Sequence, residues 1–161
     1  MTIWLLVIYL THKVILNNMT KATPALKFLL SMARAQAVMT RRFDSKLGGG
    51  IGFTDFLILY QLSLAEEGKM RRIDLAEKVG ITASGITRLL PPMEKIGLVK
   101  REESKFDARV SYVSLAPGGR RLLEERLEKA ELLAEEALPG VKEAKLKELA
   151  DVCTQLGRLT V

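Results

Sequence analysis

Hydrophobic residues recur at helical spacing along most of the chain, and glycine and proline separate the periodic segments. A first helix is predicted with Pro24 in its first turn after Thr23, a candidate N-cap; its helical period runs over 25–47, and glycines 48–50 end it. A second helix is predicted to begin at Thr54 as its N-cap and to close at Gly68, a typical terminal residue of helices. Two helices are therefore expected before the chain reaches its central region.

The next two helices follow with almost no spare residues between them. A short edge strand is predicted over 70–73 and a third helix over 74–79, with Leu75 and Ala76 facing inward. Gly80 is expected to make the turn that leads into the fourth helix. Two helices joined by so tight a turn are typical of a helix-turn-helix unit.

The fourth helix, with Thr82 as its N-cap, has two different faces. Its buried stripe is predicted at i, i+3, i+4 and i+7 and consists of Ile86, Leu89, Leu90 and Met93. The opposite stripe has the same spacing and consists of Ser84, Thr87, Arg88 and Pro91. Pro91 and Pro92 are expected to distort or end the helix and to leave 93–96 as a loose last turn, because each lacks an amide donor and its ring crowds the preceding turn.

A charged hairpin is predicted after Gly97, with strands over 98–102 and 110–114 and a polar tip between them. Val110, Tyr112 and Leu98 supply its apolar positions. This hairpin completes the order of a winged helix-turn-helix, whose second helix enters the DNA major groove. Small polar side chains and one guanidinium on the exposed stripe of that helix suit close approach to base edges and phosphates.

Two further helices are predicted after the hairpin. Pro117-Gly118-Gly119 is expected to precede a long amphipathic helix, and Pro139-Gly140 to break it from a final one. The apolar seam of the long helix has the spacing of a heptad repeat and consists of Leu123, Leu127, Ala130, Ala134 and Ala137. The apolar positions of the final helix are Leu146, Leu149, Ala150, Cys153 and Leu156. Long helices with such seams need a partner surface.

Charge is distributed unevenly along the 161 residues. The formal net charge is +6, and residues 69–121 hold 12 Lys/Arg against 6 Asp/Glu, whereas residues 122–161 hold 6 against 9. The positive excess therefore lies on the winged-helix stretch, where a polyanion would dock. The alternative is an ordinary solvated basic surface. With 48% hydrophobic and 27% charged residues the chain is long and apolar enough to form a core.

Several classes of chemistry lack the residues they need. Cys153 and His12 are the only cysteine and histidine, so neither a disulfide framework nor a metal site of these residues can form, and no cofactor is expected. No Cys–His or Ser–His pairing and no phosphate-binding loop is recognisable, so an enzyme is not predicted. This residue usage suits a reducing, cytoplasmic setting.

The first 23 residues form an apolar extension. The apolar run 3–10 is too short to span a bilayer and lacks the features of a signal peptide, so no membrane association is expected. Two interpretations are open. Residues 1–18 are either an added segment that packs on the body or on a partner, or they precede a natural start at Met19. An independent function is not expected for such a terminal segment.

The stretch 72–122 resembles the MarR family of bacterial winged-helix regulators, and the helices on either side extend the resemblance to 24–160. The matching pieces are Leu75-Ala76-Glu77, Gly80-Ile81-Thr82, Ser84, Ile86-Thr87-Arg88-Leu89-Leu90, Met93-Glu94-Lys95-Ile96-Gly97-Leu98-Val99-Lys100-Arg101, Asp107-Ala108-Arg109, Leu115 and Gly119. Most pieces occur in many winged helices. The Asp-x-Arg of the wing, between the fourth helix and the long fifth helix, is the discriminating one.

The resemblance implies a mainly α fold with a small β-wing (α+β), forming one domain over 24–161. Within it, 69–115 would be the winged helix-turn-helix lobe, and 24–68 with 116–161 the helical dimerisation lobe. A homodimer is implied, which would bind double-stranded DNA at a pseudopalindromic operator with half-sites about one helical turn apart. The implied function is a dimeric transcriptional regulator, a repressor that a small ligand releases from DNA.

The candidate DNA-binding residues lie on the fourth helix and the wing. They are Thr82, Ala83, Ser84, Thr87, Arg88, Arg101, Lys105, Asp107 and Arg109. Arg88 would either fork onto a guanine or act as a phosphate clamp. By the resemblance, Arg109 approaches the minor groove or phosphates and Asp107 pairs with a basic side chain, the alternative being a solvated tip. Arg101 and Lys105 would add phosphate attraction, and Arg71 and Arg72 would either do the same or extend over the core.

Aromatic residues gather on the first two predicted helices. The family binds small aromatic effectors between its dimerisation helices and DNA-binding lobe, so a ligand pocket is predicted at Met39, Phe43, Phe53, Phe56 and Tyr60. The same side chains would equally serve a core. Cys153, on the apolar seam of the last helix, is interpreted as a small buried hydrophobe and not as a redox sensor. A winged helix used only to bind proteins is the alternative function, but it would not need the basic wing or the Ser/Thr/Arg stripe.

Overall fold

The computed structural model describes residues 22–103 and 110–158. The apolar extension and the wing residues Lys105, Asp107 and Arg109 lie outside the described residues, so the predictions made for them stay predictions. The chain divides into two units, 1–41 and 42–161, each described by itself.

Helix α2 (Pro24–Lys46) crosses from the first unit into the second. Its beginning confirms the predicted role of Pro24, and the Thr23 hydroxyl oxygen accepts a hydrogen bond from the Leu26 amide at 3.2 Å. In the first unit most of its apolar side chains are exposed, including Leu26, Leu29 and Leu30. Phe43 is the buried residue of this helix, and it belongs to the second unit.

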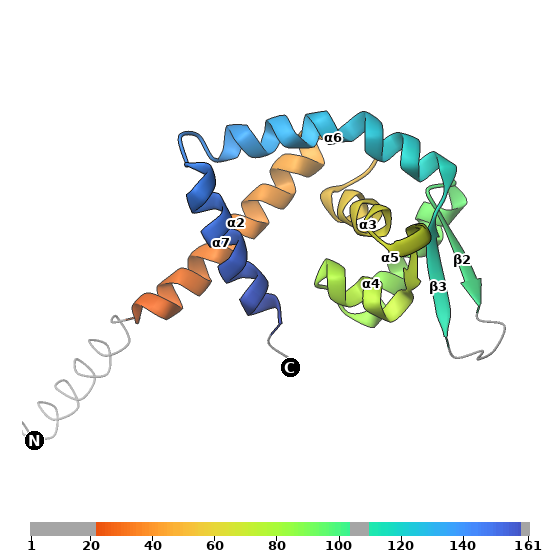
Figure 1. Cartoon of the computed structure of the whole chain (residues 1–161), viewed down its shortest axis with the longest axis horizontal. Coiled ribbons are helices and arrows are strands. Elements are labelled where there is room, and N and C mark those ends of the chain that lie inside the picture. The colour runs from red at the N-terminus through yellow and green to blue at the C-terminus, as the bar shows by residue number, and fades with distance from the viewer. Residues whose placement is uncertain (1–21, 104–109, 159–161) are drawn as a thin grey trace, which may run out of the picture. The chain divides into compact units, whose positions relative to one another are not determined.

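The second unit contains the remaining elements, and Figure 1 shows their order. They are α3 (Phe53–Ser63), the short 3-10 helix η1 (Glu66–Gly68), β1 (Lys69–Arg71), α4 (Arg72–Val79), α5 (Ala83–Lys95), β2 (Val99–Glu103), β3 (Ser111–Leu115), α6 (Pro117–Ala137) and α7 (Glu143–Gly157). Helix α6 runs along one side of the group formed by α3, α4, α5 and the strands, and α7 turns back from its far end (Figure 1). The predicted fold class, mainly helical with a small antiparallel sheet, is confirmed.

The hydrophobic core is shared by α3, α4, α5, α6, the sheet and the residue that follows α2. Its fully buried large side chains are Leu47, Ile58, Leu59, Leu62, Leu75, Ile86, Leu90, Val99, Val113 and Leu133. Within the described residues no polar or charged side chain is buried in this core. No helix among the described ranges is both long enough and apolar enough to cross a membrane.

The three strands form an antiparallel sheet in the order β1-β3-β2. Val113, in the middle of β3, stands between Met70 on β1 and Arg101 on β2. The predicted hairpin is confirmed, but both strands begin one residue later than expected, and Val113 is the core residue of β3 where Val110 and Tyr112 had been expected to supply the apolar face. An apolar pattern of so few residues does not determine which face of a strand is buried.

Two predicted features of α3 were wrong. The helix begins after Gly52 and not at Thr54, because the carboxylates of Asp44 and Asp55 accept the amide hydrogens of Phe53 at 2.6 Å and of Gly52 at 3.0 Å. It ends before Gly68, which belongs to the separate 3-10 turn. Asp44 lies nine residues before the amide it caps, so no local pattern shows its role.

The two prolines do not end α5. The helix continues through Pro91 and Pro92 to Lys95, and the Ile96 amide donates to the Pro92 carbonyl at 3.2 Å. Both proline rings lie on the exposed side, whereas Leu90 and Met93 remain buried on either side of them. Tertiary packing of the apolar stripe therefore offsets the two missing amide donors.

The long helix begins earlier than predicted. Pro117 is its first residue, and Gly118 and Gly119 lie in its first turn, where they pack against the backbone that joins α5 to β2. A Cβ on Gly118 would lie 2.6 Å from the Gly97 carbonyl oxygen, and one on Gly119 would overlap the Leu98 carbonyl oxygen. The glycines therefore allow a close approach that any side chain would prevent.

The predicted apolar seams beyond this point are buried only in part. In α6 Leu123 and Ala130 are buried as expected, together with Leu133, but Leu127 and Ala134 are exposed. No residue of α7 is buried, and Cys153 is exposed. The interpretation of Cys153 as a buried hydrophobe is therefore wrong for a single chain.

Candidate nucleic-acid interface

The beginning of α5 is built as the sequence predicts. Gly80 adopts a φ of +75°, which only glycine accepts readily, and so makes the turn between α4 and α5. The hydroxyl oxygen of Thr82 accepts the Gly85 amide hydrogen at 3.0 Å, so Thr82 is the N-cap. Helix α5 therefore starts at a defined residue, which determines which side chains face outward.

The polar stripe of α5 is exposed along its first two turns. Thr82, Ala83, Ser84, Thr87 and Arg88 are all exposed, whereas Ile86, Leu90 and Met93 on the other side are buried. The structure therefore brings together all five candidate residues predicted on this helix.

Local hydrogen bonds order the small side chains of this stripe. The hydroxyl groups of Thr82 and Ser84 lie 3.1 Å apart, and the Thr87 hydroxyl donates to the Ala83 carbonyl at 2.7 Å. Each hydroxyl keeps acceptor capacity for an outside partner. No ion pair involves Arg88 within residues 22–103 and 110–158, so no carboxylate of these residues competes with an anion for its guanidinium.

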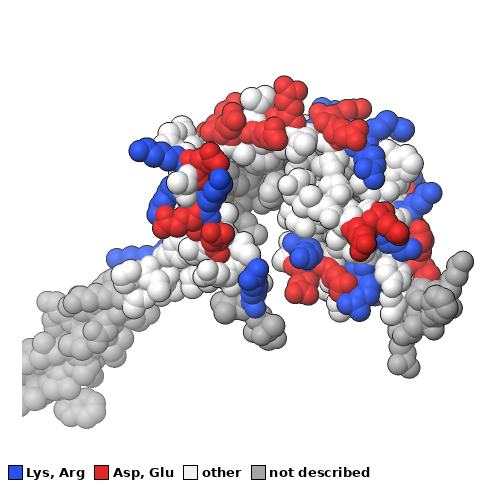
Figure 2. Space-filling view, viewed as in Figure 1, with Lys and Arg blue, Asp and Glu red and all other residues white. Residues whose placement is uncertain are grey.

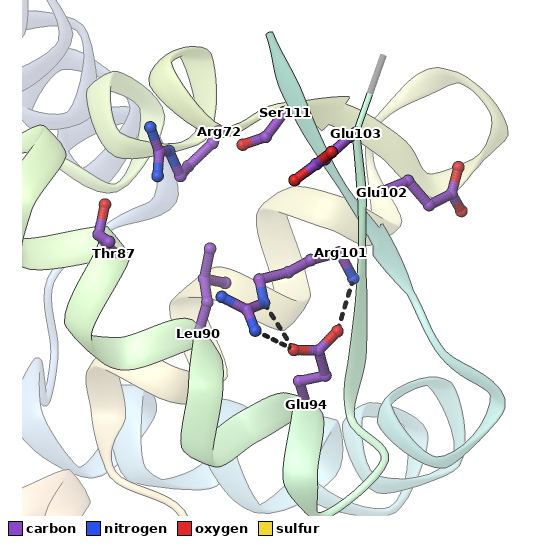
Figure 3. A pocket seen from close by; sticks show the side chains of 8 residues that line it. All are labelled: Arg72, Thr87, Leu90, Glu94, Arg101, Glu102, Glu103 and Ser111. Atoms are coloured by element: carbon purple, nitrogen blue, oxygen red, sulfur yellow. Dashed lines mark hydrogen bonds and ion pairs between the residues drawn. The ribbon is translucent and has the colours of Figure 1, made fainter. Parts of the chain in front are cut away.

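A cavity of about 320 Å³ separates α5 from the sheet. Its lining, shown in Figure 3, consists of Arg72, Thr87, Leu90, Glu94, Arg101, Glu102, Glu103 and Ser111. Arg72 and Thr87 stand on one side of it, and Arg101 reaches from β2 toward Glu94 on α5 (Figure 3). Arg72, one of the two arginines given alternative roles, therefore lines the space between the exposed helix and the wing strands.

Arg101 is not a free surface cation in this structure. Its Nε donates to Glu94 Oε2 at 2.6 Å and its backbone amide donates to Glu94 Oε1 at 3.2 Å. These bonds, the side-chain one first, hold the pKa of the Glu94 carboxyl below its usual value. The carboxylate is therefore ionised at neutral pH, and the pair would be lost only as the pH falls through that lowered pKa.

A second group of paired charges joins the two edge strands, β1 and β2, across β3. Lys69 donates to Glu102 at 2.6 Å, and its ammonium lies 5.0 Å from the centre of the Tyr112 ring. The hydrogen bond to Glu102 is the main cause of a raised pKa for Lys69, and the same bond lowers the pKa of Glu102. Arg71 is bound through two nitrogens to Asp74, so it is less available to phosphates than Arg72.

The acidic residues of the second unit are concentrated on α6. Figure 2 shows carboxylates gathered over this helix, and the exposed ones are Glu124, Glu125, Glu128, Glu131, Glu135 and Glu136. A polyanion would be repelled by this surface. The face of α5 that carries Arg88 holds no acidic residue over 82–93, so electrostatics favours α5 as the docking side.

The aromatic residues of the predicted ligand pocket lie in pairs. The Phe43 and Phe53 rings are tilted with their centres 4.6 Å apart, and the Phe56 and Tyr60 rings are stacked at 6.4 Å. Phe43 and Phe56 are buried, whereas Tyr60 is 38% exposed. These contacts are those of core residues, and the ligand pocket stays a prediction. Among the described residues no three His, Cys, Asp or Glu side chains are placed to hold a metal.

The structural role of Glu94 does not follow from its position in the sequence. Glu94 and Arg101 lie seven residues apart on opposite sides of the turn at Gly97, and no spacing rule for a helix or a strand pairs such positions. The opposite charges of Glu94 and Arg101, on either side of the turn, are the only feature of the sequence that indicates this pair.

A tight helix-turn-helix with an exposed polar second helix, followed by an antiparallel hairpin, defines a winged helix-turn-helix protein. Residues 53–111 match the model of the MarR family. The predicted resemblance to the MarR family is confirmed over this stretch.

Individual relatives agree with this assignment. The chain is 31% identical over 106 residues to the HTH-type transcriptional regulator PrsX of Escherichia coli, a match that covers 64% of either chain. Its fold is similar to that of Sco3205, a MarR family regulator from Streptomyces coelicolor in complex with DNA, with a TM-score of 0.74, 20% identity and coverage of 84% and 88% of the two chains. It is also similar to CouR from Rhodococcus jostii, bound to p-coumaroyl-CoA, with a TM-score of 0.72, 20% identity and coverage of 84% and 93%.

Proposed function

We propose that this protein is a sequence-specific, dimeric DNA-binding transcriptional regulator of the MarR family, and that α5 is its recognition helix. The observation that carries the proposal is the exposed stripe from Thr82 to Arg88, backed by the buried side chains of Ile86, Leu90 and Met93 on the same helix. Such a helix can enter a major groove without exposing the core. The match to a family of regulators, and the enzyme classes excluded above, agree with this proposal.

The roles of the side chains follow from their reach. Arg88 is the long donor of the stripe and is proposed to contact a guanine edge or a phosphate. Thr82, Ala83, Ser84 and Thr87 line the same face and are proposed to contact the adjoining bases and backbone. Lys105, Asp107 and Arg109 are proposed to bring the wing to the minor groove, as the resemblance implies.

A homodimer is the second part of the proposal. Helix α7 buries none of its residues, although Leu149 and Val152 are large and apolar, and Leu127 and Leu132 of α6 are also exposed. Contiguous exposed apolar side chains on long helices mark surfaces that another chain covers. Two copies related by a two-fold axis would present two α5 helices to a pseudopalindromic operator.

Release by a small aromatic effector is the third part. The support is that CouR, which has a similar fold, was solved with p-coumaroyl-CoA bound, and that this chain carries the paired aromatic residues Phe43, Phe53, Phe56 and Tyr60. Binding of the effector would weaken the affinity for DNA and so relieve repression.

DNA binding tests the proposal directly. The wild-type protein is used to select duplexes from a random-sequence library, and its affinity for the selected duplex is measured at two salt concentrations against a scrambled duplex. We expect selective binding that weakens steeply with salt. Arg88→Ala should lose about 1–3 kcal/mol of discrimination at one base pair if Arg88 binds a guanine.

Arg158→Ala is the matched control, because Arg158 is exposed at the end of α7, outside the proposed contact surface. It should bind the selected duplex as the wild type does. If the wild-type protein shows no salt-sensitive affinity for DNA, the proposal is wrong, and the alternative of a winged helix that binds proteins is favoured.

A further inference from the structure

Glu94 and Arg101 join the last turn of α5 to the middle of β2. One carboxylate binds two parts of the same residue: Oε2 accepts from the Arg101 guanidinium and Oε1 accepts from the Arg101 backbone amide. Figure 3 shows the pair side by side in the cavity between helix and sheet, with Leu90 next to it. The contact is therefore between two secondary-structure elements and not merely between two surface charges.

The backbone part of this contact has a separate purpose. Strand β2 is at the edge of the sheet, and Arg101 is opposite Val113 of β3. Because the Arg101 amide donates to Glu94, it is directed away from β3, toward the open edge of the sheet. Glu94 thus satisfies an edge amide that would otherwise be open to solvent or another strand.

The turn between the two elements is held at its base by the backbone alone. The Gly97 amide donates to the Glu94 carbonyl at 3.0 Å, and the Leu98 amide donates to the Met93 carbonyl at 2.9 Å. The strand diverges from the helix beyond this point, and Glu94 spans the gap. The Glu94 side chain therefore adds a direct link between helix and strand beyond the turn, besides the pairing of β2 with β3.

We propose that Glu94 and Arg101 are positioning residues, which hold the wing at a fixed angle to the recognition helix, and that Arg101 acts in DNA binding through Glu94 and not by contacting phosphate. This inference rests on the proposed DNA-binding function and replaces the phosphate role predicted for Arg101. A DNA-binding protein that inserts a helix and a wing into neighbouring grooves binds more tightly when the two are already held in the bound arrangement.

The ionisation of Glu94 agrees with this role. Its pKa is lowered chiefly by the Arg101 side-chain hydrogen bond and then by the Arg101 backbone amide. Both groups that lower it come from the residue it positions, so the carboxylate is charged whenever the pair is formed at neutral pH.

Three substitutions separate positioning from phosphate binding: Glu94→Gln, Arg101→Met and Arg101→Lys. Affinity for the duplex selected by the wild type is measured over a range of salt concentrations. If Arg101 is a positioning residue, each variant should bind about tenfold more weakly, with an unchanged slope of log affinity against log salt. Arg101→Lys is decisive, because it keeps the charge but loses the Nε–H that Glu94 accepts.

The double variant Glu94→Gln with Arg101→Met should bind no more weakly than either single variant, because both remove the same contact. Circular dichroism and thermal unfolding of each variant show that the protein measured is folded. Glu143→Gln and Lys147→Met are the matched controls, since Glu143 and Lys147 form an exposed pair with a 2.7 Å contact on the side of α7 away from Leu149 and Val152. Both controls should bind DNA as the wild type does.

Two results would overturn the inference while leaving the proposed function intact. One is a loss of about one in the salt slope for Arg101→Met together with normal binding by Arg101→Lys, which is the behaviour of a phosphate contact. The other is tighter binding and a steeper slope for Glu94→Gln, which would mean that Glu94 merely competes with phosphate for Arg101. Failure of the wild type to select any duplex would instead reject the DNA-binding function itself.

Discussion

Helices α5 and α7 are of similar length and are both amphipathic, yet they use their apolar residues differently. In α5 (Ala83–Lys95) Ile86 and Leu90 are fully buried inside the chain. In α7 (Glu143–Gly157) no residue is buried, and Leu149 is 39% exposed. The comparison teaches that an apolar stripe on a helix predicts that the stripe will be covered, but not whether the covering surface belongs to the same chain. The core within the chain covers α5, whereas α7 presents its stripe outward.

Helix α6 shows both behaviours on its two faces. Its first turns are packed so closely that Gly119 contacts the backbone after α5, and Leu123 is buried. Further along, Ala130 and Leu133 remain buried, whereas Leu127 and Leu132 are exposed. One face of this helix therefore belongs to the core within the chain, and the other carries exposed leucines of the surface proposed for dimerisation.

The largest expected effect comes from making the same leucine-to-alanine substitution in the buried core and in α7. Leu59→Ala removes a fully buried side chain of α3 and should lower the free energy of unfolding by about 2–5 kcal/mol. Leu149→Ala removes a partly exposed one from α7 and should cost less than about 1 kcal/mol at a protein concentration low enough to keep the chains apart. Urea unfolding followed by circular dichroism measures both. Equal losses would show that α7 is part of the same core.

A smaller effect is expected where a glycine allows close packing. A Cβ at position 119 would lie 3.0 Å from side-chain carbons of Leu59 and Leu115 and would overlap the Leu98 carbonyl oxygen, so Gly119→Ala should lower stability by about 1–3 kcal/mol. Gly157→Ala is the control, since no atom lies within 4 Å of a Cβ there. It should be neutral or stabilise by up to about 1 kcal/mol, because alanine favours helix. Thermal unfolding distinguishes the two, and a neutral Gly119→Ala would contradict the close contact.

The smallest effect on the stability of the winged helix is expected from charge on α7. Val152 is 38% exposed, so Val152→Glu should change the unfolding free energy of a separate chain by less than about 0.5 kcal/mol. It should, however, weaken association of two copies, measured by sedimentation equilibrium. Cys153 is exposed in one chain and reports on the same surface. Its thiol should react slowly with a maleimide in the associated protein and faster in the variant.

Thr154→Glu, at an exposed position two residues further along α7, is the control for that substitution. Association should be retained in it, because residues two apart on a helix face different directions. Equal association of wild type and Val152→Glu would show that this face of α7 is not the dimer surface.

Much of the candidate site could be predicted from local pattern. The Thr82 cap, the turn at Gly80 and the two faces of α5 all follow from residues within one turn of each other, and the structure confirms them. The roles of Asp44 and Glu94 could not be predicted in this way. Each acts on a backbone amide that is seven or nine residues away, across a change of element.

The sequence by itself determined the winged helix-turn-helix, its resemblance to the MarR family and the face of α5 that points outward, because glycine turns, hydroxyl caps and helical periodicity act over a few residues. Only the tertiary structure decided that α5 continues through its two prolines, that Val113 is the core residue of β3 and that Gly119 packs against the chain after α5. It also decided which apolar stripes are buried within one chain. Each of these outcomes depends on surfaces that meet only after folding, where packing outweighs local preference.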